Sequence, residues 1–176
     1  EWYLNKTTKQ FQMYFGTASP SAYPVKVSTL DTLIGMNGKG YITIRDLAFE
    51  GANANTIYAF NCNNISVINC DVRNAGESGV MTWNTSNFLA DGVTTNNTLN
   101  NGIFGLNSKV SYATVRNCVV KNNGVLPGMG LSSGNSYKGM RIDGNFLTIE
   151  YNKLDSIGYS GIEFQGNDVM VRNNVV

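Results

Sequence analysis

The sequence predicts an all-β solenoid, a chain wound into stacked coils of short parallel strands, and three observations support this. The 176 residues include 25 Asn and 19 Gly but only three Pro, a composition that favours turns over helices. Six segments repeat one short apolar–polar phrase, with starts separated by 22 to 34 residues. A second strand phrase, in most copies Gly followed by an aliphatic residue, comes after each of the first five. Two strand phrases per period are typical of a solenoid rather than a sandwich.

The N-terminal region, residues 1–40, precedes the repeats, which occupy residues 41–176. Residues 1–15 are predicted to form a β-hairpin, because an apolar strand, a polar turn and an aromatic strand follow one another. Residues 24–40 are expected to form a first partial coil, with Val25, Val27 and Ile34 pointing inward. The chain starts without Met and stops inside the repeat pattern, which indicates a piece of a longer or processed polypeptide.

The first phrase defines columns of residues that stacking brings to within about 4.8 Å of one another. It occurs at residues 44–49, 67–72, 90–95, 115–120, 149–154 and 171–176. Two apolar columns are predicted to face inward: Ile44, Val67, Ala90, Val115, Ile149 and Val171, and then Phe49, Val72, Thr95, Val120, Leu154 and Val176. A third column is predicted to take the left-handed backbone of a bend: Asp46, Asn69, Gly92, Asn117, Tyr151 and Asn173.

The second phrase gives the strands whose outer face is of interest for function. Its copies are Thr56-Ile57, Gly79-Val80, Gly102-Ile103, Gly130-Leu131 and Gly161-Ile162. The outward columns are then Tyr58, Met81, Phe104, Ser132 and Glu163, and Phe60, Trp83, Leu106, Gly134 and Gln165. The longest spacing between repeats marks an insertion, assigned to residues 134–144, after a Gly-rich loop at residues 122–130. Long loops on a regular scaffold are where function concentrates.

Charge and cysteine content exclude several classes of protein. A net charge of +1 gives no electrostatic reason to bind nucleic acid, and no apolar run of about 18 residues predicts a membrane span. The absence of His removes His-based triads and His metal sites. Cys62, Cys70 and Cys118 are expected to be reduced, since the Val93 coil separates Cys70 from Cys118 and Cys62 lies at a different turn.

Two outward columns carry charges that are interpreted as cross-strand ion pairs rather than catalytic groups. One alternates in sign through its last four members, Asp91, Arg116, Glu150 and Arg172. The other is expected to pair Glu50 with Arg73 and Lys121 with Asp155.

The repeat of the form V-x-N-N/C-x-V followed by G-I, over residues 41–176, resembles the right-handed parallel β-helix proteins of the pectate-lyase-like superfamily. Residues 1–15 look like the lead-in of many secreted bacterial carbohydrate-active members. The resemblance implies a right-handed parallel β-helix of about six coils with an N-terminal β-hairpin. It also implies a secreted or surface-bound bacterial protein that acts on a polysaccharide or cell-surface glycan. No cofactor is implied, and no acidic cluster indicates calcium.

The resemblance places the substrate groove over the outer face of the Gly-Ile strands. An apolar strip on that face is expected to stack against sugar rings, and its aromatic members are Tyr58, Phe60, Trp83 and Phe104. The alternative is that the hairpin of residues 1–15, or another domain, covers the strip.

Catalytic candidates converge near the insertion, and they are Glu163, Asp155, Asp143, Lys138, Arg141 and Tyr159. A polysaccharide lyase needs a base and a cation that neutralises the uronate carboxylate, for which Lys138, Arg141 and Tyr159 are candidates. A glycoside hydrolase needs two carboxyl groups, about 5–5.5 Å apart for a retaining enzyme or about 6.5–9.5 Å apart for an inverting one. Glu163 is a candidate for one of them, and the candidates for its partner are Asp143, Asp155 or a residue outside this segment.

Two non-enzymatic alternatives stay open. One is a glycan-binding or adhesion β-helix that uses the aromatic strip without catalysis. The other is a structural β-helix that self-associates end to end or side by side, because the open ends of a solenoid carry unpaired strand edges.

Overall fold

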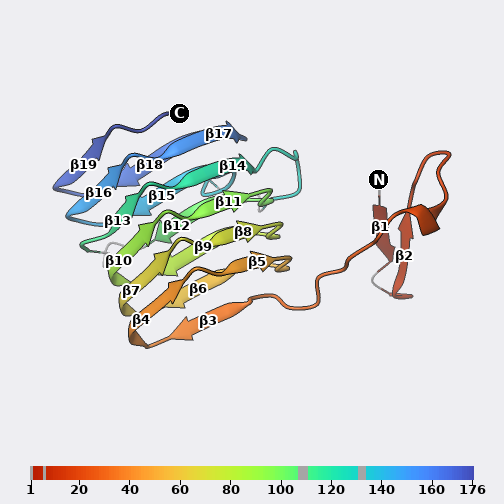
Figure 1. The fold of residues 1–176 in the computed structure, drawn as a ribbon, viewed down its shortest axis with the longest axis horizontal. Coiled ribbons are helices and arrows are strands. Elements are labelled where there is room, and N and C mark those ends of the chain that lie inside the picture. The colour runs from red at the N-terminus through yellow and green to blue at the C-terminus, as the bar shows by residue number, and fades with distance from the viewer. Residues whose placement is uncertain (1, 6, 107–110, 131–133) are drawn as a thin grey trace.

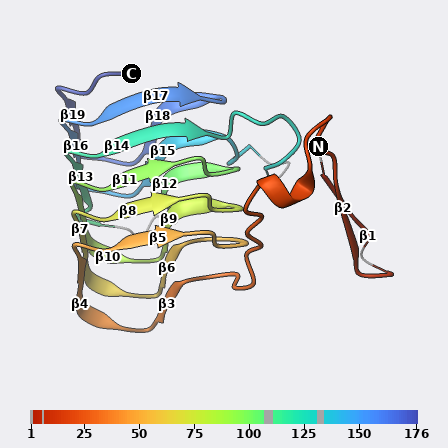
Figure 2. The ribbon, with the colours of Figure 1, turned by 45° about the vertical axis from the view of Figure 1, so that its right-hand side comes forward.

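The computed structural model describes residues 2–5, 7–106, 111–130 and 134–176, which form an N-terminal hairpin and a β-solenoid of about six turns. The hairpin consists of β1 (Trp2–Asn5) and β2 (Gln10–Met13), which pair antiparallel, and the short 3-10 helix η1 (Pro20–Ala22) follows it. Figures 1 and 2 show the hairpin beside the solenoid, to which residues 24–33 connect it. Among the described residues, no helix is long and apolar enough to cross a membrane.

Three parallel sheets form the walls of the solenoid in the described residues. The first, called here the β3–β18 sheet, contains β3 (Ile34–Asn37), β6 (Ile57–Phe60), β9 (Ser78–Trp83), β12 (Asn101–Leu106), β15 (Lys138–Asp143) and β18 (Ser160–Gln165). The β4–β19 sheet contains β4 (Gly40–Arg45), β7 (Asn63–Ile68), β10 (Ser86–Asp91), β13 (Thr114–Arg116), β16 (Leu147–Glu150) and β19 (Val169–Arg172). The β5–β17 sheet contains β5 (Ala48–Glu50), β8 (Asp71–Arg73), β11 (Thr94–Asn96), β14 (Val119–Asn123) and β17 (Lys153–Ile157). Figure 2 shows these strands stacked as successive coils.

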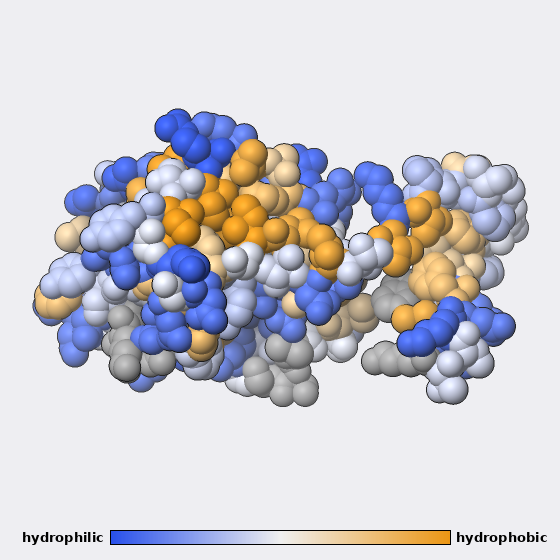
Figure 3. All heavy atoms as spheres, turned by 90° about the horizontal axis from the view of Figure 1, so that it is seen from below, coloured by the Kyte–Doolittle hydropathy of each residue, from blue (hydrophilic) through white to orange (hydrophobic). Residues whose placement is uncertain are grey.

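The predicted inward columns form the core, except in the last coil, where Val171 and Val176 are 40% and 74% exposed. Val67 pairs in register with Ile44 and Ala90, and Val115 pairs with Ala90 and Ile149, as the repeat predicted. All of these side chains are buried. At the end of the solenoid that carries β3 and β4, apolar residues gather on the surface seen in Figure 3, and Ile34 and Ile42 pack there against the core while only partly buried.

The turn between the β4–β19 sheet and the β5–β17 sheet has the predicted left-handed backbone in every coil. The φ angles lie between 49° and 66° for Asp46, Asn69, Gly92, Asn117, Tyr151 and Asn173. Side chains link neighbouring coils here, since the Asn69 amide donates to Asp46 at 3.3 Å and the Asn117 amide to Asp91 at 2.8 Å. Asn and Asp suit this position because their short polar side chains tolerate the conformation and supply the bond.

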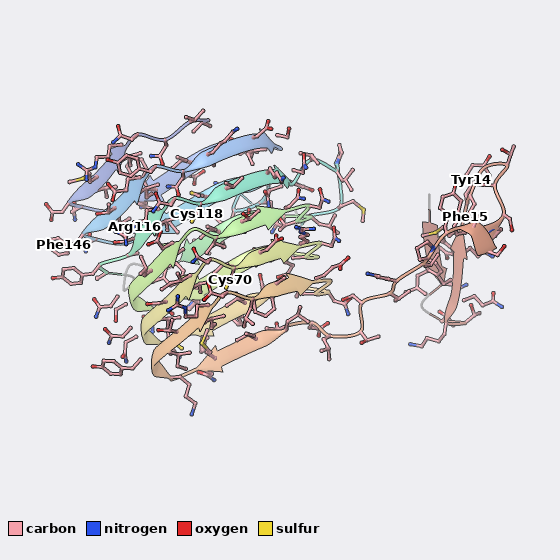
Figure 4. All side chains as sticks on the ribbon, viewed as in Figure 1. Tyr14, Phe15, Cys70, Arg116, Cys118 and Phe146 are labelled. Atoms are coloured by element: carbon pink, nitrogen blue, oxygen red, sulfur yellow. The ribbon has the colours of Figure 1, made fainter. Side chains whose placement is uncertain are left out.

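The next residue of the same turn is a buried Cys70, Cys118 or Asn152 in three of the coils, whereas Cys62 lies at the turn between β6 and β7. Cys62, Cys70 and Cys118 are reduced and buried, as predicted, and Figure 4 shows Cys70 and Cys118 within the coils. Burial raises the pKa of Cys118 to about 12. One coil on, Asn152 accepts from the backbone N–H of Cys118 at 2.9 Å and donates to the carbonyl of Val115 at 3.0 Å, so it satisfies buried backbone groups.

The start of the solenoid differs from the expectation for residues 24–40. Val25 and Val27 are 47% and 71% exposed, so the prediction that they point inward is wrong, whereas Ile34 does pack against the core. Residues 26–31 lie instead next to β5 and the turn that follows it. There the backbone N–H of Asn53 donates to the carbonyl of Leu30 at 2.8 Å. Backbone bonds fix this segment, and its valines face solvent.

Candidate functional site

The outer face of the β3–β18 sheet carries an apolar strip that continues into a cluster of charges. In one column Tyr58 pairs with Met81, Met81 with Phe104, Phe104 with Arg141 and Arg141 with Glu163. The neighbouring column contains Phe60, Trp83 and Leu106, and then Asp143 beside Gln165. The outward positions of one sheet face therefore change along the solenoid from apolar to charged.

The fourth member of each column corrects the sequence prediction. Arg141 occupies the position assigned to Ser132, and Asp143 the position assigned to Gly134. Leu131 and Ser132 lie outside the described residues. The strand phrase of this coil is Gly139-Met140, so the added residues precede β15, and residues 138–143 of the assigned insertion are strand. The signal was in the sequence: Gly139 precedes the next repeat by 10 residues, as Gly161 does, whereas Gly130 precedes it by 19.

Three of the four aromatic residues predicted to bind sugar have exposed surface. Trp83 is 37% exposed, Tyr58 and Phe60 are half-buried, and Phe104 is buried at 5%. The Tyr58 and Phe60 rings lie 6.2 Å apart and border a shallow depression of about 270 Å³. Burial, with a smaller effect of Glu77, raises the pKa of Tyr58. The hairpin lies to one side in Figures 1 and 2 and does not cover these strands.

The charged cluster is defined by Lys138, Arg141, Asp143 and Glu163. The Lys138 ammonium forms an ion pair with Oε2 of Glu163, and Nη1 of Arg141 lies 2.9 Å from Oε1 of the same carboxylate. Nη2 of Arg141 lies 2.8 Å from Oδ2 of Asp143. The guanidinium thus bridges two carboxylates, and Glu163 accepts from two cations.

The cluster is largely withdrawn from water. The side chain of Lys138 is 3% exposed, those of Asp143 and Arg141 are 13% and 15% exposed, and that of Glu163 is 34% exposed. Hydrogen bonds to Asp143 raise the pKa of Arg141, and the negative charge of Glu163 adds to the effect. Low local polarity strengthens these pairs relative to surface ones.

Local backbone features place Lys138 and Arg141 on the same side of the sheet. A Cβ at Gly139 would lie 2.7 Å from a Leu154 methyl group inside the solenoid, so Gly139 and Met140 both face inward. The residues on either side of this pair therefore both face outward. The side-chain carbonyl of Asn101, one coil earlier, accepts the Lys138 backbone N–H at 2.9 Å and fixes the start of the strand.

Two residues outside the strand complete the surroundings. The Tyr159 ring centroid lies 5.9 Å from the Lys138 ammonium, and Tyr159 is 78% exposed. Nη1 of Arg141 also donates to the side-chain oxygen of Asn135, which belongs to the added loop. Sequence reasoning missed Asn101 and Asn135, because in a chain with 25 Asn nothing distinguished them.

Of the six predicted catalytic residues, the structure brings together five and leaves Asp155 apart. Asp155 lies on β17 in the β5–β17 sheet, paired in register with Lys121, and it is exposed. Its carboxylate accepts from the Ser156 hydroxyl at 3.2 Å.

The other predicted ion pairs are only partly present. Arg116 pairs with Asp91 and Arg172 with Glu150, as predicted. Arg73 pairs instead with Asp71 on its own strand, and Glu50 with Lys26 at 3.5 Å. Within the described part of the chain, Lys121 and Asp155 form no ion pair.

The geometry limits what the cluster can do chemically. A glycosidase places two carboxyl groups on either side of the scissile bond, but here the Arg141 guanidinium bridges Asp143 and Glu163. Two cations held around one carboxylate form instead a site for a negatively charged group. No three Cys, Asp or Glu residues of the described chain lie close enough together to hold a metal ion.

Comparison with known proteins identifies the family to which the chain belongs. The family model described as "Right handed beta helix region" matches residues 25–176, which covers the described solenoid from before β3 to the C-terminal end. Searches of curated proteins and of solved structures found no match. The chain belongs to the right-handed β-helix family.

Proposed function

We propose that the β3–β18 face binds an acidic polysaccharide and that the charged cluster cleaves it by β-elimination. The observation that carries the proposal is the continuity of the apolar strip with the cluster on one sheet face. Trp83, Tyr58 and Phe60 supply aromatic surface for sugar rings, and Arg141 and Lys138 supply two cations for a carboxylate. A polysaccharide substrate would place the protein outside the cell, secreted or on a bacterial surface.

In this proposal the carboxylate of Glu163 occupies the place that a substrate carboxylate takes when it binds. Glu163 is the most exposed member of the cluster, so its side chain is free to turn toward solvent while Lys138 and Arg141 keep an anionic partner. Asp143 stays bonded to Arg141 and holds the guanidinium in position.

Tyr159 is the proposed base, because it is exposed beside the buried ammonium of Lys138. It would remove the proton α to the uronate carboxyl group. The electron pair of that C–H bond would form the C4–C5 double bond as the C4–O bond to the leaving sugar breaks. Tyr159 would then pass the abstracted proton to the leaving oxygen, and Arg141 and Lys138 would stabilise the charge on the carboxylate.

The test incubates the protein with polygalacturonate and alginate as acidic polymers and with xylan and dextran as neutral ones. We expect new reducing ends together with absorbance of the unsaturated uronide on an acidic polymer. Tyr159→Phe is expected to lower kcat by about 10²–10⁴-fold with little change in KM, the range for loss of a general base. Tyr151→Phe is the matched control, since Tyr151 is also an exposed turn tyrosine but lies at the turn after the β4–β19 sheet.

Other outcomes would redirect the proposal. Reducing ends without absorbance would mean hydrolysis, and unchanged kcat in Tyr159→Phe would remove Tyr159 from the mechanism. Absence of saturable binding to every polymer would overturn the proposed function as a whole.

A second candidate is a glycan-binding β-helix without catalysis. The observation that favours it is that all four charges of the cluster are already paired with one another. This alternative predicts saturable polysaccharide binding that Trp83→Ala abolishes, with no product formed by the wild-type protein.

A further inference from the structure

At the corner between the β3–β18 sheet and the β4–β19 sheet, each coil has a left-handed residue either at the second position of its β4–β19 strand or just before that strand. The column, with φ between 51° and 59°, consists of Tyr41, Asn64, Asn87, Tyr112, Phe146 and Asp168. Asn and Asp are enriched in this conformation, whereas bulky aromatic residues adopt it rarely. Where the chain only has to turn, as at Asn64 and Asn87, Asn suffices. The aromatic residues in the same column need another explanation.

Tyr112 and Phe146 occupy neighbouring coils and form one exposed aromatic unit. Their ring centroids lie 4.9 Å apart with an interplanar angle of 6°, and the residues are 59% and 49% exposed. Figure 4 shows the Phe146 side chain pointing away from the solenoid at the corner where the coils turn. Two bulky side chains are therefore held in a disfavoured backbone conformation, stacked and open to solvent. Tyr41 and Tyr151 share this backbone conformation, so it is the stacking of two exposed rings, and not the conformation alone, that distinguishes the pair.

The aromatic pair lies next to the charged cluster. Phe146 follows Asp143 by three residues, which limits the distance between their Cα atoms to about 11 Å. Backbone bonds fix the corner, since Phe146 donates its N–H to the carbonyl of Asn167 at 3.0 Å and Tyr112 to that of Asn145 at 3.0 Å. Tyr159 is exposed directly before β18, at the other end of the two strands. Along the direction of β15 and β18, exposed aromatic residues thus lie at both ends, and the four charges lie between them.

We infer that the Tyr112–Phe146 pair is a sugar-binding subsite, on which a pyranose ring of the polysaccharide stacks beyond the charged cluster. The inference rests on the proposed function and adds a direction to it: the bound chain runs along β15 and β18, past the charged cluster, toward this corner. Aromatic faces bind the C–H faces of sugar rings by apolar contact, and the pair offers such surface at a fixed position. A short oligosaccharide that reaches only the charged cluster does not touch it.

The test is a double variant, Tyr112→Asn with Phe146→Asn, which uses the residue that the column itself carries at Asn64 and Asn87. We expect the unfolding midpoint to stay the same or rise, because Asn relieves the backbone strain. The KM for hexasaccharides of polygalacturonate or alginate should rise about tenfold, while kcat and the KM for disaccharides change little. Tyr41→Asn is the matched control, since Tyr41 has the same backbone conformation and lies in the first coil, far from the cluster.

The outcomes separate this inference from the proposed function on which it rests. Equal hexasaccharide affinity in the double variant and the wild type overturns the subsite, while a loss of binding in Arg141→Ala leaves the proposed function standing. An equal loss in Tyr41→Asn also overturns the subsite, because a change at the far end of the column would then do the same. A wild-type protein that binds neither polymer overturns both.

Discussion

The ion pair between Lys138 and Glu163 provides the sharpest test of how the charged cluster is held together. Glu163→Ala removes the carboxylate that faces an ammonium only 3% exposed, so a nearly buried cation loses its ion-pair partner. Breaking a buried pair in this way costs about 3–5 kcal/mol. Glu163 itself is 34% exposed, which lets water reach the site once its side chain is shortened. We therefore expect a loss of about 2–3 kcal/mol in the free energy of unfolding.

The opposite change should cost much less. Lys138→Met replaces the ammonium with an apolar side chain of similar length, and Glu163 keeps Arg141 as a partner 2.9 Å away. Because Glu163 is 34% exposed and keeps Arg141, this variant leaves no buried charge without a partner, so we expect a change within about 1 kcal/mol. In the Lys138→Met background, Glu163→Ala should then cost less than about 1 kcal/mol. The coupling energy between the two sites should be about 1.5–2 kcal/mol.

Urea denaturation of the two single variants, the double variant and the wild type measures this cycle, and thermal unfolding should show a loss of about 4–12 °C for Glu163→Ala. The control is Glu150→Ala, whose partner Arg172 is 54% exposed and can be solvated, so the loss should stay within about 1 kcal/mol. Additive effects within about 0.3 kcal/mol would refute the reasoning, because the ammonium would then not depend on Glu163.

Three further predictions concern the scaffold. Gly102→Ala should lower the free energy of unfolding by about 2–3 kcal/mol in urea, because a Cβ there would lie 2.5 Å from a backbone carbonyl, whereas Gly134→Ala, with open space, should stay within about 0.5 kcal/mol. Cys118 should react with a disulfide reagent at pH 8 only after denaturation, since burial raises its pKa to about 12; fast labelling of the native protein would contradict this. Burial acts to raise the pKa of Asp91, but hydrogen bonds from Asn117 and Arg116 outweigh it and lower the pKa below 3.8. Its stabilisation is therefore present at pH 7 and lost as the pH falls through the folded-state pKa. Asp91→Asn should cost about 0.5–1 kcal/mol at pH 7 and nothing near pH 2, and an equal cost at both would show that charge is not the cause.

The parts of the fold that were predicted from the sequence are those in which each coil repeats the same physical requirement. An inward position is apolar in nearly every coil, with Thr95 as an exception, so Val67, Val115 and their neighbours could be aligned without a structure. The left-handed bend was visible for a similar reason, because Asn, Asp and Gly recur at it. Repetition lets each coil support the assignment of the others.

The errors arose where a local choice had several solutions of similar energy. Gly130-Leu131 and Gly139-Met140 both fit the second strand phrase, and only the distance to the next repeat, which is 10 to 13 residues in the other coils, selects the second. Arg73 has carboxylates within reach on its own strand and on the preceding coil, and surface pairs differ too little in energy for the sequence to rank them. The structure shows the pair with Asp71.

The candidate site combines both kinds of feature, and this explains why its residues were predicted but their arrangement was not. Glu163 stands at a repeated outward position, so its placement followed from the repeat. Lys138 and Arg141 reach it because the added residues all precede β15, which keeps the strand in register and leaves the core of this coil unchanged. A solenoid tolerates extra residues only in its turns, since a longer strand would shift every inward side chain of that coil. The loop therefore enters the site from the side, through Asn135 on Arg141, while the charges themselves lie on the rigid sheet. That division of roles, with the charges on the strands and adjustment in the turn, is what a preorganised site on this fold requires.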